Sequence, residues 1–389
     1  MANVGDFEME TFDVIVVGLG AMGSATAYTL AKRGARVLGI DANLPHSKLG
    51  SSHGPTRATR ESYFESPEYV PLARRSNDLW RKLEAESNAR LLDIKGALYF
   101  APQNHPLLNG VCLAADQHGL AVEKIDTEEA EQRYPGFSVP DGWQILREPG
   151  AGLLQAEACL DAFRDLARRH GAQLRFQSAA TRWRQEGGGV VVTVNGEEIS
   201  AGRLVLTLGP WACDAFASLG LPLKPRRIPV VYFDTKQPKN YDPNDFSVYF
   251  WAAPEGFFAG KPHFDNLGTM LLRHDAGDAA SPDTIQRVVT DKDRGEVSDF
   301  AAKYIPGLND GIRSAHVCMY TMTPDNHFIV DQHPNMPDVT IATGFSGHGF
   351  KFAPIIGQML ADLALNGHTS LPVGFLSIDR FASKQAGAA

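Results

Sequence analysis

The segment from Gly50 to Arg60 concentrates side chains that could recognise an anion. It reads Gly-Ser-Ser-His-Gly-Pro-Thr-Arg-Ala-Thr-Arg, and Glu65 follows it closely. A guanidinium group is a planar set of donors that can hold a carboxylate through two hydrogen bonds. The segment therefore predicts an anion site in which Arg57 and Arg60 are the cations. The alternative is a surface loop whose arginines pair with Glu61 or Glu65.

Two more segments with reactive groups lie near the carboxyl-terminal end. One contains Cys318 in the run Val-Cys-Met-Tyr-Thr. A lone cysteine is most often a small buried hydrophobic residue. The other, Gly344–Lys351, reads Gly-Phe-Ser-Gly-His-Gly-Phe-Lys and presents a cation that could stabilise a reduced, anionic cofactor ring. A hydrolase nucleophile elbow is excluded, because His348 stands where that motif requires glycine.

The first fifty residues predict a dinucleotide-binding unit. An apolar strand, Phe12–Val17, runs into Gly-Leu-Gly-Ala-Met-Gly at 18–23 and then into a helical stretch. Glycines at these positions allow a tight turn and close approach of a pyrophosphate to the helix N-terminus. A second strand ends at Asp41, where a carboxylate would hold ribose hydroxyls. This pattern alone does not distinguish NAD from FAD.

The rest of the chain predicts a second domain. Between residues 222 and 310 the sequence has short β-like runs, proline-containing turns and a polar helix expected at 284–304, which is typical of an antiparallel sheet with a helix. The strand-and-glycine pattern returns at 339–349. We therefore expect an α/β (α+β) fold, with a discontinuous Rossmann-like domain at 1–85, 150–220 and 312–389 and a substrate domain at 86–149 and 221–311.

Composition favours a small-molecule partner. The formal net charge is -8, and the sequence has no run of basic residues, which argues against nucleic acid or an anionic membrane as the partner. The segment 1–11 has no apolar stretch suited to a signal peptide, so we expect a cytoplasmic protein. The four cysteines are scattered, and their spacing predicts neither disulfides nor a metal site.

Together these segments resemble the monomeric sarcosine oxidase and N-methyltryptophan oxidase family over nearly the whole chain. The resemblance is carried by Gly18–Gly23, by His53-Gly-x-Thr-Arg-x-x-Arg60, by Cys318-Met-Tyr-Thr321 and by Gly344–Lys351. It implies an FAD enzyme, typically a monomer, in which Cys318 forms a thioether to the flavin 8-methyl group.

The resemblance also implies roles for individual residues. Those assigned to catalysis are Arg57, His274, Tyr320 and Lys351. Those assigned to substrate binding are Arg60, Tyr63, Ala259, Met270 and Lys351. Those assigned to the cofactor are Gly18, Gly20, Ala21, Met22, Gly23, Asp41, Ser51, His53, Thr56, Arg57, Ala180, Gly209, Trp211, Cys318, Gly344, Gly347, His348, Gly349 and Lys351.

Charge considerations support the substrate site that this resemblance implies. A carboxylate that enters a closed pocket loses hydration and must meet a buried cation, for which Arg60 and Lys351 are the candidates. A neighbouring amine is favoured in its neutral form by such cations. Hydride transfer to flavin from the carbon beside the amine would give an imine, which water hydrolyses, with hydrogen peroxide as co-product if oxygen is the acceptor.

Two positions depart from the family pattern. Met270 aligns with a lysine that lies over the flavin ring and assists oxygen, although Lys261 or Arg273 could take over from nearby. A thioether cannot stabilise charge that develops on oxygen, so a dehydrogenase with another electron acceptor is an alternative. Ala259 replaces a pocket tyrosine, which predicts a differently shaped pocket and leaves a fructosyl-amino acid oxidase as another alternative.

Two further alternatives concern the class of protein. An NAD-linked dehydrogenase would share the segment from Gly18 to Asp41 but would not use Cys318 or the turn ending at Lys351. A flavoprotein that has lost turnover would bind FAD without being reduced by any secondary amine.

Overall fold

The computed structural model describes residues 11–308 and 311–381, and the chain divides into two compact units. Unit 1 comprises residues 1–53, 157–223 and 323–389, and unit 2 comprises 54–156 and 224–322. Residues 54–85, 150–156 and 312–322, which the sequence placed with the nucleotide-binding domain, fall in unit 2, because β3 (Thr56–Thr59), β8 (Gly152–Gln155) and β17 (Ile312–Met322) pair with strands of that unit. Residues 221–223, which the sequence placed with the substrate domain, fall in unit 1. The expectation for segment 1–11 concerns residues that lie almost wholly outside the described part.

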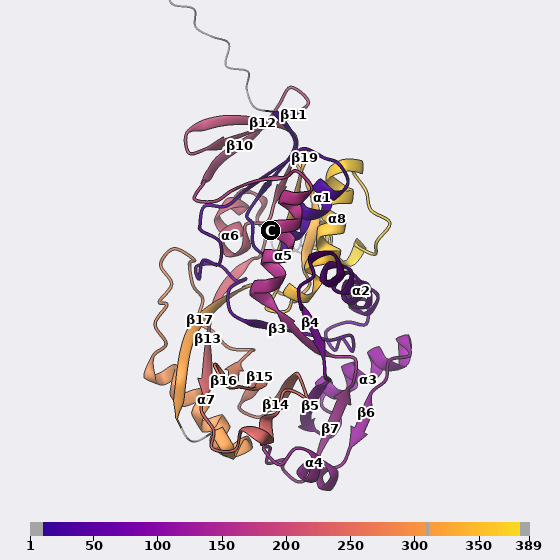
Figure 1. Cartoon of the computed structure of the whole chain (residues 1–389), viewed down its shortest axis with the longest axis vertical. Coiled ribbons are helices and arrows are strands. Elements are labelled where there is room, and N and C mark those ends of the chain that lie inside the picture. The colour runs from indigo at the N-terminus through magenta and orange to yellow at the C-terminus, as the bar shows by residue number, and fades with distance from the viewer. Residues whose placement is uncertain (1–10, 309–310, 382–389) are drawn as a thin grey trace, which may run out of the picture. The chain divides into compact units, whose positions relative to one another are not determined.

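Unit 1 is built on a sheet with a parallel centre (Figure 1). Strand β1 pairs in parallel with β2 on one side and with β12 on the other, and β12 also pairs in parallel with β19. Residues 14–16 of β1 are fully buried, as expected for a central strand covered on both faces. The helices and strands of unit 1 are β1 Thr11–Val17, α1 Ala21–Lys32, β2 Val37–Ile40, α5 Ala156–Arg169, β9 Gln173–Arg175, β10 Ala180–Glu186, β11 Gly189–Val194, β12 Glu197–Leu206, α6 Ala212–Ala215, β18 Ile329–His333, β19 Met336–Thr343 and α8 Ala353–Asn366.

Unit 2 contains a second large sheet, in which β14 and β5 are parallel and the other pairs are antiparallel. Its strand order is β17-β13-β16-β15-β14-β5-β7-β6, and a small sheet has the order β3-β8-β4. Its helices and strands are β3 Thr56–Thr59, α2 Tyr69–Ser87, β4 Leu92–Ile94, β5 Ala97–Pro102, α3 Pro106–His118, β6 Glu123–Ile125, α4 Thr127–Arg133, β7 Trp143–Glu148, β8 Gly152–Gln155, β13 Lys224–Phe233, β14 Val248–Ala253, β15 Gly256–Phe264, β16 Gly268–Arg273, α7 Asp291–Tyr304 and β17 Ile312–Met322.

These elements confirm the expected fold class and correct one boundary. Helix α7 begins at Asp291, although the sequence pattern placed its start at Thr284. Thr290 and Asp293 form a capping box, in which each side chain accepts a hydrogen bond from the other residue's backbone N–H. This arrangement stops a helix from extending further towards its N-terminus.

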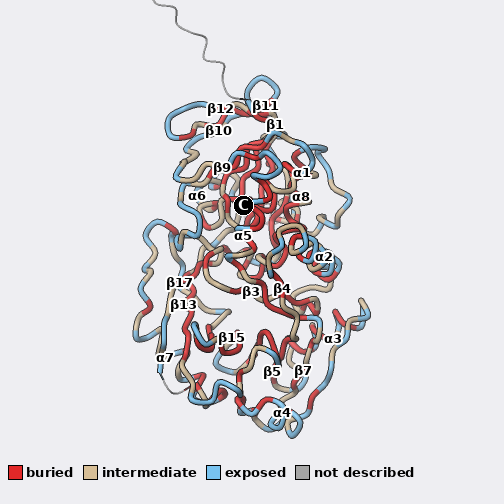
Figure 2. The backbone as a smooth tube through the Cα atoms, viewed as in Figure 1, coloured by how far each residue is buried: buried red, intermediate tan, exposed pale blue. Residues whose placement is uncertain are grey.

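The two faces of the unit 2 sheet carry separate buried clusters. Alternate side chains of a strand point to opposite faces, so Val231 and Leu271 belong to one cluster, whereas Val230 and Met270 belong to the other. Figure 2 shows the buried interiors and the exposed turns, including the turn between β10 and β11. No described helix is long and apolar enough to cross a membrane. The described residues contain no cluster of His, Cys, Asp and Glu suited to a metal ion.

Candidate cofactor and substrate sites

The glycine-rich turn of unit 1 leaves the start of helix α1 suited to an anion. The N-cap residue of this helix is Gly20, which has no side chain to cap it, and no acidic residue lies in the first turn. Gly18 has a φ of +91°, and a Cβ at Gly23 would lie 1.7 Å from the carbonyl oxygen of Gly18, so both positions require glycine. The backbone N–H of Ala21 donates to Ser52 Oγ at 3.0 Å. This helix N-terminus can therefore accept a pyrophosphate.

Asp41 and Thr207 hold the same turn from two strands. Asp41, directly after β2, accepts hydrogen bonds from the backbone N–H groups of Leu19 and Asn43, each at 2.8 Å. Thr207, directly after β12, donates to the carbonyl oxygen of Gly18 at 2.7 Å. A carboxylate has about four lone-pair directions, so Asp41 can still accept from ribose hydroxyls.

Arg164 is a buried cation at this turn that the sequence reasoning missed. Its Nη2 donates to the carbonyl oxygen of Leu19 at 2.7 Å and its Nε to Ser24 Oγ at 3.3 Å. Its Nη1 is buried and has no hydrogen-bond partner among the described residues. Burial lowers the pKa of Arg164. The unpaired donor fits a site that receives an anionic group. The signal in the sequence was an arginine on the apolar face of an amphipathic helix, beside Phe163 and Ala167.

The turn after β19 is also shaped by side-chain hydrogen bonds. Ser346, which has a positive φ of 46°, accepts a hydrogen bond at Oγ from the backbone N–H of Thr323 at 3.2 Å. His348 Nε2 lies 2.9 Å from the carbonyl oxygen of Asn326, and the buried Lys351 donates to the carbonyl oxygen of His348 at 2.7 Å. Thr343 Oγ1 is buried without a partner among the described residues. A polar ligand group would satisfy it.

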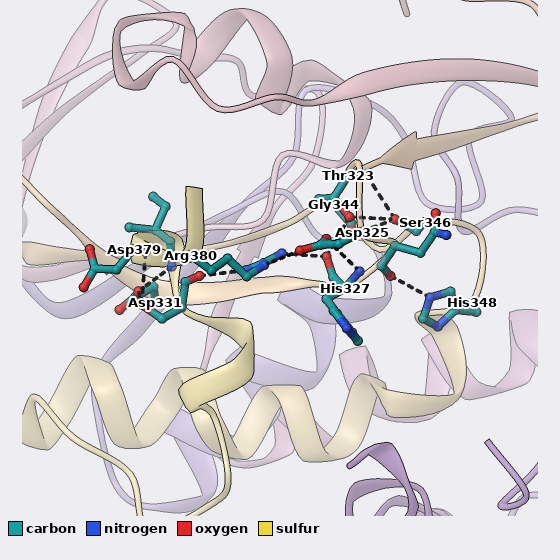
Figure 3. Close-up of polar contacts among 12 residues, drawn as sticks. Thr323, Asp325, His327, Asp331, Gly344, Ser346, His348, Asp379 and Arg380 are labelled. Atoms are coloured by element: carbon teal, nitrogen blue, oxygen red, sulfur yellow. Dashed lines mark hydrogen bonds and ion pairs between the residues drawn. The ribbon is translucent and has the colours of Figure 1, made fainter. Parts of the chain in front are cut away.

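A network around Arg380 supports the loop that carries Thr323 (Figure 3). Arg380 donates to Asp325 at 2.9 Å, to the carbonyl oxygen of His327 at 2.8 Å and to that of Ser377 at 2.7 Å. Asp331 accepts from Ser377 Oγ at 2.7 Å. The carboxyl-terminal segment thus fixes the loop against which the glycine-rich turn after β19 is held.

In unit 2, Arg60 is buried and already paired. Its Nη2 lies 2.5 and 2.7 Å from the two carboxylate oxygens of Glu65. The guanidinium carbon lies 4.0 Å from the centre of the Tyr63 ring and 4.2 Å from that of Phe64. Burial alone would lower the pKa of Arg60, but the charge and hydrogen bond of Glu65 together with Tyr63 and Tyr99 outweigh burial and raise the pKa. The pairing with Glu65 that the sequence left open is therefore present, in the interior and not on an exposed loop.

Glu148, another residue that sequence reasoning missed, anchors the loop that carries Arg60. This buried carboxylate at the end of β7 accepts from the backbone N–H groups of Glu61 at 2.6 Å and Ser62 at 3.0 Å, and from the Tyr99 hydroxyl at 2.6 Å. Burial raises its pKa, and these hydrogen bonds oppose that shift. The sequence offered only an acidic residue at the end of an apolar strand.

One face of the large sheet in unit 2 gathers four of the expected site residues. Cys318 is buried on β17, and Tyr320 lies two residues further along the same strand. Met270 of β16 and Ala259 of β15 belong to the same buried cluster as Cys318. The Tyr320 hydroxyl lies 2.9 Å from His274 Nδ1, and burial raises the pKa of Tyr320. The structure thus brings together a thiol, a phenol and an imidazole, which the sequence separates by up to 46 positions.

The small sheet contributes Thr56 and Arg57 to unit 2. Thr56 is buried on β3, and its carbonyl oxygen accepts hydrogen bonds from Arg57 Nη1 at 2.9 Å and from Lys261 Nζ at 2.6 Å. Lys261 also donates to the Thr56 hydroxyl at 2.8 Å. Two basic side chains therefore donate to one backbone carbonyl.

The other expected cofactor residues lie in unit 1. Ser51 is half-buried and His53 is buried, both in the segment after β2. Ala180 is the first residue of β10, and Gly209 and Trp211 form a single helical turn shortly after β12.

Comparison with known proteins identifies what the chain resembles. The family model described as FAD dependent oxidoreductase matches residues 13–363. Monomeric sarcosine oxidase of Bacillus sp. (strain B-0618) is 38% identical over 380 residues, which cover 96% of this chain and 97% of the relative. N-methyl-L-tryptophan oxidase of Yersinia pestis (strain Pestoides F) is 31% identical over 376 residues, which cover 95% and 99%.

Two solved structures share the fold. L-proline dehydrogenase from P. horikoshii has a TM-score of 0.84 at 25% identity, with 97% of this chain and 99% of that chain covered. Fructosyl amine:oxygen oxidoreductase (Amadoriase I) from Aspergillus fumigatus has a TM-score of 0.77 at 20% identity, with 94% and 89% covered. The second likeness concerns the fold alone.

Proposed function

Because this chain belongs to the FAD dependent oxidoreductases, and within them to the family of monomeric sarcosine oxidase and N-methyl-L-tryptophan oxidase, we propose that it oxidises a small secondary amino acid. The protein is an FAD-dependent enzyme that acts on CH–NH donors. When bound, FAD accepts a hydride from the carbon beside the amine. The resulting imine is hydrolysed by water to an amine and a carbonyl product.

The observation that carries this proposal is the composition of one face of the large sheet in unit 2. Cys318, Tyr320 and Met270 share that face, and His274 is hydrogen-bonded to Tyr320. The fit to FAD is supported separately in unit 1 by the glycine-rich N-terminus of α1, which has no acidic residue in its first turn, and by the unpaired Nη1 of Arg164. A helix N-terminus and a buried unpaired donor both favour an anionic ligand.

We propose that Cys318 is the covalent attachment point of FAD. Its thiol is buried on the site face and donates a weak hydrogen bond, at 3.8 Å, to the carbonyl oxygen of Met319. Denaturing the protein in acid tests this. FAD should precipitate with the parent protein and remain in solution with Cys318→Ala, whereas release of FAD from the parent would refute the tether.

We propose that Arg60 and Lys351 bind the substrate carboxylate. Both are buried, and a buried cation offsets the hydration that a carboxylate loses. Because Glu65 already occupies Arg60, a bound substrate must share or replace that partner. The pair Tyr320–His274 would then orient the amine, and Tyr63, Ala259 and Met270 would shape the pocket.

The class of amine that this protein oxidises can be identified by anaerobic reduction of the flavin. Anaerobic mixing with sarcosine, other N-methyl amino acids, pipecolate and fructosyl-glycine, followed by flavin absorbance, identifies the substrate class. Bleaching by N-methyl amino acids supports the proposal, whereas no bleaching by any secondary amine would refute it. Bleaching by fructosyl-glycine alone would favour the Amadori-product alternative, for which the only support is a shared fold.

We propose a cytoplasmic monomer that uses oxygen, with a dehydrogenase as the second candidate because Met270 lies on the site face.

A further inference from the structure

Lys261 is a buried amine to which the proposed amine oxidation assigns no role. Only 7% of the residue is exposed. Its Nζ donates to the Thr56 carbonyl oxygen at 2.6 Å and to the Thr56 hydroxyl at 2.8 Å. Within the described ranges no carboxylate forms an ion pair with it. Lysine is almost never buried without a charged partner, so its place in the interior requires a reason.

The sheet register places Lys261 directly opposite Met270. Strands β15 and β16 are antiparallel, and Lys261 and Met270 are cross-strand partners. Directly paired residues project to the same face with Cβ atoms about 5 Å apart. The register shifts just after Lys261, where Pro262 lacks an N–H group for the ladder. Such bulges re-aim side chains. Lys261 can therefore reach the region that a side chain at position 270 occupies.

The same face also carries Cys318. Met270 pairs with Tyr232 on β13, and Cys318 pairs with Ile228 on the same strand. Residues 228 and 232 are separated by an even number of positions, so their side chains point to one face. Lys261, Met270 and Cys318 accordingly project to a single face of the sheet.

We propose that Lys261 is a catalytic residue that sets positive charge beside the flavin ring from the strand opposite Met270, stabilising the anionic reduced cofactor and assisting electron transfer to oxygen. This inference rests on the proposed function and on flavin bound near Cys318. In the oxidative half-reaction two electrons pass from the reduced cofactor to oxygen. The N5 proton and one proton from solvent complete hydrogen peroxide, and oxidised FAD remains.

Electrostatics support this role. Burial and the neighbouring Arg57 lower the pKa of Lys261 well below its usual value, while the Cys318 thiol acts in the opposite direction. A negative charge that develops beside Lys261 opposes this lowering and favours the protonated, positively charged form of its amine. A fixed donor aimed at developing negative charge costs no reorganisation when the charge appears. Oxygen reactivity therefore does not require a lysine at position 270.

The test compares neutral substitutions at position 261 with a cross-strand exchange. The variants are Lys261→Met, Lys261→Gln and the double variant Lys261→Met/Met270→Lys. Lys261→Gln keeps a donor for the Thr56 carbonyl and removes only the charge, so it remains informative if Lys261→Met does not take up FAD. Lys292→Met, an exposed lysine of the same unit, is the matched control. Each holoenzyme is reduced anaerobically with dithionite and mixed with air-saturated buffer.

We expect both neutral variants to reoxidise about 100-fold more slowly than the parent, the range for loss of one preorganised electrostatic group. The double variant should recover most of that rate, and Lys292→Met should match the parent. A readout independent of turnover is the dissociation constant of the sulfite adduct at flavin N5, which should rise at least about tenfold in both neutral variants because the adduct is anionic.

Unchanged reoxidation and sulfite binding in Lys261→Gln would overturn the proposal and leave Lys261 as a support for Thr56. A parent enzyme that oxygen reoxidises no faster than the neutral variants would overturn it as well. Neither result affects the proposed amine oxidation, which is measured by anaerobic reduction with substrate.

Discussion

Unit 2 contains two buried basic side chains, of which one is paired with a carboxylate and the other donates to neutral oxygen atoms. Arg60 lies between aromatic rings with its charge neutralised by Glu65. Lys261 donates instead to the backbone carbonyl and the hydroxyl of Thr56. A paired cation must exchange its partner before it binds a ligand, whereas a cation without a counter-ion already favours a negative charge. The difference suggests that Arg60 selects an arriving carboxylate and that Lys261 responds to charge created during the reaction.

Of the substitutions that test this difference, Arg60→Met should have the largest effect, a fall in kcat/KM. The change removes the proposed carboxylate partner and leaves Glu65 without its cation. Truncating one partner of a buried charge pair costs about 2–5 kcal/mol, so kcat/KM for a secondary amino acid should fall at least about 30-fold. Steady-state kinetics measure this, with the carboxamide of the same substrate as control, since it should lose much less. Equal losses for acid and amide would contradict the role of Arg60.

The second-largest effect is expected from Glu148→Ala, which should lower the free energy of unfolding by loosening the loop that carries Arg60. It leaves two backbone N–H groups and the Tyr99 hydroxyl without their acceptor, at about 1–3 kcal/mol for each buried unsatisfied group before relaxation and water entry. Urea unfolding followed by circular dichroism should show a loss of about 2–4 kcal/mol in unfolding free energy. The conservative variant Glu148→Gln keeps one acceptor and should lose less. Parent-like stability in Glu148→Ala would show that the loop is held by other contacts.

Glu65→Gln should leave Arg60, like Lys261, buried without a carboxylate partner. With the competing charge removed and the shape kept, a simple carboxylate such as acetate should bind about three- to tenfold more tightly, a difference of about 1 kcal/mol. Titration of the flavin spectrum with acetate measures this. The exposed substitution Glu129→Gln, in the same unit, is the control. Weaker acetate binding in Glu65→Gln would mean that Glu65 positions Arg60 instead of competing with the ligand.

The smallest change is expected from Tyr320→Phe, which removes the hydrogen bond to His274 at 2.9 Å. A single neutral hydrogen bond contributes as little as about 0.5 kcal/mol, so the rate of anaerobic flavin reduction by substrate should fall about two- to threefold. Reoxidation of the reduced enzyme should be unchanged, which separates this pair from Lys261. A slower reoxidation would place Tyr320 in the oxygen reaction instead.

Local sequence patterns predicted the structure of the glycine-rich turn after β1 well. The run from Phe12 to Gly23 combines a buried strand, required glycines and a helix start, and each of these signals acts over a few residues. The start of α7 was predicted poorly, because the pattern did not weigh the capping box at Thr290 against the polar residues before it. Arg164 was missed because an arginine in an amphipathic helix is usually exposed, and its burial depends on the turn after β1.

The sequence by itself determined the FAD dependent oxidoreductase family, the dinucleotide-binding motif and the candidate thiol, because these depend on residue type and short spacing. Tertiary structure alone decided that Arg60 pairs with Glu65 in the interior and that Glu148 supports its loop. It also decided that Lys261 stands across the ladder from Met270. The physical reason is that cross-strand register and burial arise from pairing between distant segments, and shifting the register of a strand by one residue would turn each of its side chains to the other face.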